Sequence, residues 1–206
     1  MFKEVADIKT ADQLHLPVPE AKFETVVAKP SDLQKEMVQE LSKRAAEIHS
    51  GTVDASVDNM LCVTNDGRKI GLDVRLMTPM LPDDPNSKLN VCVQNVLKIW
   101  EEGKDQKLTQ LLFCDLSTPK NDGNFNVYDD IRKKLIAAGV PESEIEFIHN
   151  ADTKAKKAAL FSRVRSGDAR VLLGSTAKMG AGTNVQSRLV AVHHLDVGWK
   201  PSDMTQ

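Results

Sequence analysis

The second half of the chain alternates short apolar runs with longer amphipathic stretches. Short apolar runs that are bounded by turn signals are typical of buried strands. We therefore predict strands in the runs at residues 108–114, 145–148, 171–173 and 189–195.

The stretches between these runs have the apolar spacing of helices. The first carries Tyr128, Ile131, Leu135 and Ile136, and the second carries Ala158, Leu160, Phe161 and Val164. Strands that alternate with helices are joined by right-handed crossovers, which gives a mostly parallel sheet with helices on both faces. We predict an α/β fold whose ligand site lies beyond the carboxyl ends of the strands.

The first half predicts helices that are joined by proline-containing connections. Ser31 and Gln34 have the spacing of a capping box. The apolar positions after them recur at helical spacing until Gly51, and the charged residues between them predict a solvated face. Ser87 is suited to cap a second helix, which carries Trp100 in its apolar face.

The segment between these two helices is open to two interpretations. Asn65-Asp66-Gly67 is a turn signal, which favours a short hairpin. The flanking residues are equally compatible with a helix through Lys69 to Leu76. The sequence pattern does not choose between them.

Composition excludes several classes of protein. The chain has 206 residues, a net charge of −2, 41% hydrophobic residues and 27% charged residues, all close to the average of globular proteins. No run approaches the length that spans a membrane, and residues 1–10 have no apolar run behind their charges, so we expect neither membrane insertion nor secretion. The cysteines Cys62, Cys92 and Cys114 form no CxxC pair, which favours the reducing cytoplasm and disfavours zinc. We expect no metal site and no membrane partner.

The loop after the third apolar run carries the clearest chemical signal. Residues 174–184 combine glycines with the hydroxyls of Ser175, Thr176 and Thr183. A strand that enters such a loop lets backbone N–H groups approach an anion, most often a phosphate. The GxxxxGK[ST] spacing of a Walker A loop is absent. An ordinary glycine-rich turn has the same spacing, so both readings stay open.

A basic stretch precedes this loop. It contains Lys154, Lys156, Lys157, Arg163, Arg165 and Arg170. Such a cluster suits either a sequence-independent grip on nucleic-acid phosphates or a solvated helix face. Near-zero net charge and few aromatic residues argue against a polycation or a base-stacking surface.

The order of segments around the loop resembles superfamily-two helicases of the Swi/Snf-like branch. Residues 171–184 resemble motif V, and 196–201 (DVGWKP) resemble that branch's D-x-x-W-N-P segment. Phe113, Cys114 and Asp115 resemble the motif IV region. Met179 and Lys200 depart from the pattern, which calls for Gly and Asn there.

A narrower resemblance covers nearly the whole chain. It is to the large helicase/adenine-methyltransferase proteins of bacterial conjugative elements and phages. The segments that carry it are residues 2–10, 16–19, 29–31, 58–61, 66–69, 73–76, 81–85 and 113–119.

The resemblance implies a piece of a motor. Residues 1–30 would be the end of a first lobe or a connector, 31–105 a helical connecting segment, and 106–206 a RecA-like helicase C-terminal lobe that stops before motif VI. Its implied partners are the DNA backbone, the first lobe and a fused adenine methyltransferase domain. ATP and Mg²⁺ would be cofactors of the longer protein, and no catalytic residue or turnover is expected of this piece alone.

The resemblance also implies roles for individual residues. The residues expected to contact the nucleotide are Gly180, Gly182, Thr183 and Asn184. The residues expected to contact nucleic acid are Ser175, Thr176, Lys178, Lys154, Lys157 and Arg163.

Other functions remain open from sequence. The chain also suits a RecA-like docking module for DNA or protein that has lost motor function. A self-contained phosphotransferase is disfavoured because no general base has a convincing spacing. Asp115 and Asp196 suit helix capping or the orientation of a nucleotide or a motif residue, and Trp199 suits packing or base stacking. For His193, His194 and Cys114 we expect structural roles.

Overall fold

A parallel sheet forms from the predicted apolar runs. The computed structural model describes residues 20–120, 122–180 and 183–198. Its strands are β1 (Thr109–Phe113), β2 (Ile145–Phe147), β3 (Val171–Gly174) and β4 (Leu189–His194), in the order β2-β3-β1-β4. Every pairing is parallel. The predicted α/β class is therefore confirmed, and the arrangement is consistent with a RecA-like fold.

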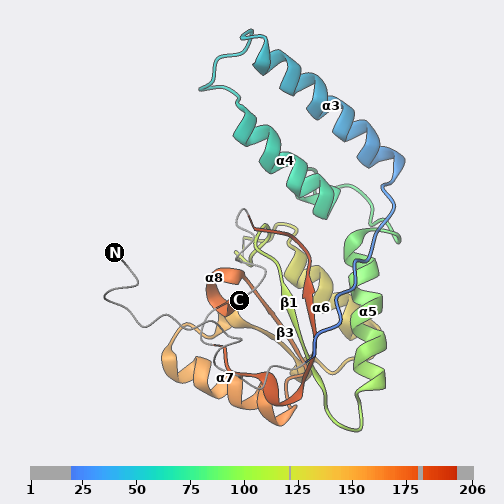
Figure 1. The fold of residues 1–206 in the computed structure, drawn as a ribbon, viewed down its shortest axis with the longest axis vertical. Coiled ribbons are helices and arrows are strands. Elements are labelled where there is room, and N and C mark those ends of the chain that lie inside the picture. Colours follow the sequence, from blue (N-terminus) through green and yellow to red (C-terminus); the bar gives the residue numbers. More distant parts are fainter. Residues whose placement is uncertain (1–19, 121, 181–182, 199–206) are drawn as a thin grey trace, which may run out of the picture.

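Helices cover both faces of the sheet, as Figure 1 shows. They are α5 (Lys88–Glu102), α6 (Val127–Ala137), α7 (Lys154–Ser166) and the short α8 (Thr176–Met179). Leu112 faces the core that contains α5 and α6. Its neighbour Leu111 faces the core that contains α7 and α8. Successive strand residues point to opposite faces, so the central strands β1 and β3 contribute side chains to both cores.

Helix α5 belongs to the sheet unit. Its apolar face is buried in the same core as Leu112 and Leu173 of the strands. The division expected at residues 105/106 therefore cuts through one hydrophobic core. The α/β unit begins upstream of it, at α5.

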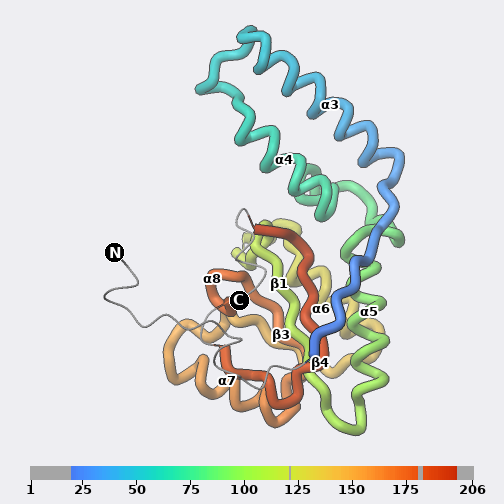
Figure 2. The backbone as a smooth tube through the Cα atoms, in the orientation of Figure 1, coloured from blue at the N-terminus to red at the C-terminus, as the bar shows by residue number. Residues whose placement is uncertain are grey.

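A helical hairpin projects from the sheet unit on the side where the strands end (Figures 1 and 2). It consists of α3 (Asp32–His49) and α4 (Met60–Leu72). The predicted capping box is present, because Ser31 and Gln34 bond each other's backbone N–H groups. No residue of α3 is buried, so the hairpin depends on contacts between its two helices.

The turn signal at residues 65–67 was misleading, because it lies inside α4. Asn59 caps this helix upstream by accepting the N–H groups of its first turn. Gly67 lies against α3, where a Cβ would be 3.5 Å from Leu41 Cδ1. Asp66 forms an ion pair with Arg44 of α3 at 2.9 Å. Packing between the helices thus overrides the local preference of these residues for a turn.

The base of the hairpin is joined to the sheet unit by polar contacts. Arg68 of α4 donates to the carbonyl of Val197, two residues after Leu195, at 2.7 Å. The 3-10 helix η1 (Val74–Leu76) follows α4 and carries the buried Arg75. Arg75 bonds Asp130 of α6 at 3.0 Å. These contacts hold the hairpin above the carboxyl edge of the sheet.

His193 of β4 is part of the sheet's structure, as expected. Its Nε2 lies 2.9 Å from Oε1 of the buried Gln110, whose own amide donates to the carbonyl of Val96 in α5. Burial, with a smaller contribution from His194, lowers the pKa of His193 from 6.5 to about 4. The folded protein therefore holds this imidazole neutral under conditions where the unfolded chain protonates it.

We expect stability to fall in acid because of His193. Its contribution is fully present above about pH 6.5 and is lost as the pH falls towards 4, because the unfolded state binds the proton first. The shift corresponds to about 3 kcal/mol of unfolding free energy. Urea unfolding at pH 7 and pH 4.5 should show a smaller acid loss for His193→Gln than for the native chain. The control His49→Gln, on the exposed last turn of α3, should retain the native acid loss.

Candidate functional site at the carboxyl edge of the sheet

The carboxyl ends of the described strands lie at one edge of the sheet, the edge that faces the hairpin (Figure 1). Asp115 follows β1, His149 follows β2, Thr176 follows β3 and Asp196 follows β4. This edge is where ligands bind in open parallel sheets. We call these residues the carboxyl-edge cluster.

Asp115 connects the end of β1 to the start of α8. Its Oδ1 accepts the backbone N–H of Thr176 at 2.8 Å, and its Oδ2 accepts the Thr176 hydroxyl at 2.7 Å. The carboxylate therefore fixes the position and the rotamer of Thr176. Of the roles open from sequence, the structure shows that Asp115 caps a helix, because it accepts the first N–H of α8.

Asp196 connects the end of β4 back to β1. Its carboxylate accepts the N–H of Asp115 at 2.9 Å and that of Leu116 at 2.6 Å. Burial is the main cause that raises the pKa of Asp196, and the negative charge of Asp115 adds to it. The segments after β1, β3 and β4 are thus joined through these two carboxylates.

The residues before Asp115 are structural. Phe113 is half-buried and stacks on His194 with ring centroids 5.1 Å apart. Cys114 is buried, and burial raises the pKa of its thiol far above the usual range. Its carbonyl accepts the hydroxyl of Tyr128 from α6 at 2.7 Å. Phe113 and Cys114 therefore stabilise the carboxyl ends of the strands through packing. The buried thiol of Cys114 is not reactive.

One polar atom at this edge and one further along the glycine-rich loop have no hydrogen-bond partner within the described part of the chain. They are Nδ1 of His149 and Oγ1 of Thr183, and both are buried. Burial, with the positive charge of Lys178, lowers the pKa of His149, so its ring is neutral at pH 7. Sequence analysis did not select His149 individually. A buried polar atom that lacks a partner costs free energy, so these atoms fit contacts with a ligand.

The residues of the glycine-rich loop do not all lie at the carboxyl edge of the sheet. Ser175 is buried and Lys178 is exposed, both at the carboxyl edge, and Gly180 caps α8. Asn184 instead lies beside the last turn of α7, where its carbonyl accepts from Arg165 at 2.8 Å. Gly182 lies outside the described residues, as do Trp199 and Lys200.

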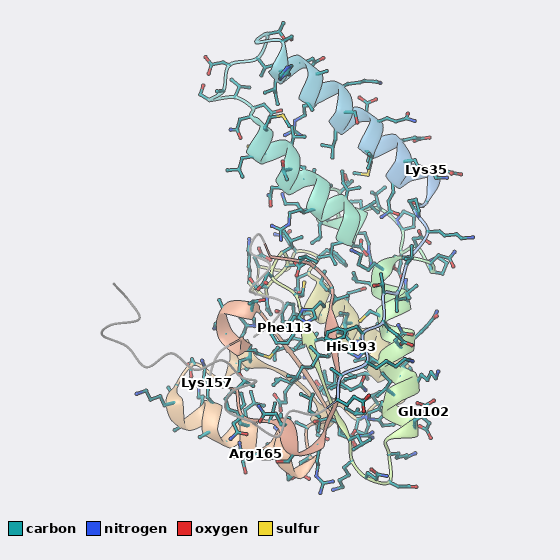
Figure 3. The ribbon with its side chains drawn as sticks, viewed as in Figure 1. Lys35, Glu102, Phe113, Lys157, Arg165 and His193 are labelled. Carbon is teal, nitrogen blue, oxygen red and sulfur yellow. The ribbon has the colours of Figure 1, made fainter. Side chains whose placement is uncertain are left out.

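The basic stretch is divided between the two ends of α7. Lys154 is exposed and Lys157 is half-buried in its first turns, on the side of the carboxyl edge. Arg165 lies about 12 Å further along the axis, and Figure 3 shows it and Lys157 at opposite ends of the helix. Arg163 bonds Glu146 and the carbonyl of Ser143. The structure therefore does not bring Arg163 to Lys154 and Lys157.

Arg170 does not belong to a surface cluster. Its side chain is 3% exposed and lies at the amino end of the sheet. Its position in the basic stretch is misleading, because its donors bond the carbonyls of Leu108 and Trp100.

No group in the described ranges could hold a metal ion. The oxygens of Asp115 and Asp196 already accept N–H and O–H groups, so this pair does not fit Mg²⁺. The described helices also include none that is long and apolar enough to cross a membrane. No protein-family model matches the chain, and no curated protein matches it.

Proposed function

We propose that the chain is the second RecA-like lobe of a DNA helicase or translocase driven by ATP, which acts in the cytoplasm. One observation carries the proposal: Asp115 and Asp196 join the segments that resemble motif IV, motif V and the D-x-x-W segment. These segments are far apart in the sequence. A motor needs its nucleotide and nucleic-acid contacts to move together, and this network couples them mechanically.

In this proposal the nucleic-acid backbone contacts the exposed side of the carboxyl edge. Lys178 is exposed there and Thr176 is half-buried, with Lys154 and Lys157 at the adjacent start of α7. Ser175 is buried, so its side chain lies behind this surface. Arg163 contributes no phosphate contact, because Glu146 and Ser143 already hold its guanidinium. ATP would lie between this lobe and the first, where it would bond the buried hydroxyl of Thr183, which has no partner among the residues that the structure describes. Mg²⁺ would be held by residues of the first lobe.

A docking module without motor activity is the second candidate. Asp115 accepts both the N–H and the hydroxyl of Thr176. Thr176 therefore needs no bound phosphate to satisfy its donors, which favours a module that only docks. Such a module would bind DNA or protein but would not turn over ATP in any context.

Duplex binding tests the DNA contact. We expect the native chain to bind a 20-bp duplex in fluorescence anisotropy, with an affinity that falls steeply as salt rises. Lys154→Ala/Lys157→Ala should reduce the slope of log K against log [salt] by about 1.8, the value for two lost phosphate contacts. Lys35→Ala/Lys43→Ala removes two exposed lysines of α3 and should keep the native slope. Equal slopes for both variants would contradict this placement of the DNA.

A further inference from the structure

A cleft opens at the amino end of the sheet, opposite the carboxyl-edge cluster. Its volume is about 630 Å³, which lies within the range of small-molecule sites. The lining carries the cations of Lys104, Lys107, Arg163 and Arg170, against the carboxylates of Glu144 and Asp168. Two further carboxylates lie beside the lining, where Glu146 pairs with Arg163 and Glu101 lies 3.7 Å from Lys104.

Arg170 is the most informative residue of the cleft. Its side chain is 3% exposed, and Nε donates to the carbonyl of Leu108 at 3.0 Å. The nearest carboxylate oxygen, Oε2 of Glu144, is 3.7 Å from NH1, beyond hydrogen-bond distance. That oxygen already accepts the indole N–H of Trp100 at 2.7 Å. NH2 donates to the carbonyl of Trp100, so NH1 is the nitrogen of this guanidinium that has no hydrogen bond among the described residues. An anion that enters the cleft would complete it.

The other cations of the cleft are held loosely. Lys107 lies 3.6 Å from Asp168, and Lys104 lies 3.7 Å from Glu101 and 5.6 Å from the centre of the Trp100 ring. Both lysine side chains are more than half exposed, so they can turn towards a ligand at little cost. The backbone of Gly167 packs closely against Lys107, because a Cβ at residue 167 would come within 2.5 Å of the Lys107 Cβ. A larger residue at this position would displace Lys107.

We propose that this cleft binds a small molecule that carries a phosphate group, with Arg170 at its floor and Lys104 and Lys107 at its rim. A planar guanidinium presents paired donors that match phosphate oxygens, and the mobile ammonium groups add charge. Only a group that enters the cleft reaches Arg170, which favours a small ligand over a nucleic-acid backbone. The proposal does not depend on the motor function, because the cleft and the carboxyl edge lie at opposite ends of the strands.

Tryptophan fluorescence tests the proposal, with pyrophosphate as the probe. The chain has two tryptophans, so Trp199→Phe leaves Trp100 as the reporter within the cleft. At constant ionic strength, we expect a saturable change with a dissociation constant below about 1 mM. Lys104→Ala/Lys107→Ala in this background should weaken binding at least about tenfold. The control Lys35→Ala/Lys43→Ala should bind like the parent, and thermal melts confirm that each variant folds.

Three results would overturn the proposal. The first is the absence of a saturable change with pyrophosphate up to about 10 mM. The second is equal weakening by both lysine pairs, which would indicate a general effect of charge. The third is a response to a 20-bp duplex without a response to pyrophosphate, which would make the cleft a nucleic-acid surface. Retained duplex binding with no pyrophosphate response in the cleft would leave the proposed motor function intact.

Discussion

Arg75→Met is expected to lower the free energy of unfolding by about 3–5 kcal/mol. The Arg75 side chain is 8% exposed and lies 2.7 Å from Asp73, 2.9 Å from Asp83 and 3.0 Å from Asp130. Methionine keeps much of the volume but leaves Asp83 and Asp130 with only Lys134, and the buried Asp73 with no ion-pair partner among the described residues. Uncompensated buried charge is the main reason for the large loss.

Urea unfolding measures this loss directly. The matched control is Arg132→Met, because Arg132 of α6 pairs with the exposed Glu142 and should contribute at most about 1 kcal/mol. A loss for Arg75→Met that is no larger than the control's would contradict the role of Arg75 in fastening the hairpin to the sheet unit.

Asp115→Ala is expected to reduce DNA-stimulated ATP hydrolysis about a hundredfold in the complete motor, meaning this chain together with the first lobe and motif VI. The substitution removes the partner of both the Thr176 N–H and the Thr176 hydroxyl, so the start of α8 loses its fixed position. A displacement of this kind near a reacting site is enough for a loss of that size.

Two further variants separate positioning from folding. Asp115→Asn keeps an oxygen that accepts the Thr176 N–H, so it should restore part of the rate. Asp122→Ala changes an exposed aspartate that bonds Asn124 in the same connection, and it should leave the rate unchanged. Native thermal melts with an unchanged rate in Asp115→Ala would remove Asp115 from the coupling path.

Much of the fold is predictable because its signals are local. The capping box of Ser31 and the cap at Ser87 both occur where the sequence indicates. The apolar runs of β1 and β3 become central strands because the parallel sheet buries them on both faces, whereas β4 lies at the edge with alternate residues exposed. The continuation of α4 through Asn65 and Gly67 is not predictable in this way, because it depends on Arg44 and Leu41 of another helix.

The candidate site is only partly predictable. The carboxyl edge and the roles open to Asp115 and Asp196 follow from strand order and position. The division of the basic stretch does not, because Glu144 and Glu146, which pair with Arg170 and Arg163, come from the region of β2. The spacing of the polar residues along α7 does not indicate that any of them pairs with a glutamate near β2. His149 likewise has no individual signal, since its unpartnered nitrogen is a property of the packed edge.

ATP hydrolysis, measured with and without DNA, tests the motor proposal most directly. The 206-residue chain should be compared with a longer chain that adds the preceding lobe and the residues through motif VI. We predict no turnover by the 206-residue chain and DNA-stimulated turnover by the longer one, since both lobes must enclose the phosphates. Turnover by the 206-residue chain alone, or none by either chain, would contradict the proposal.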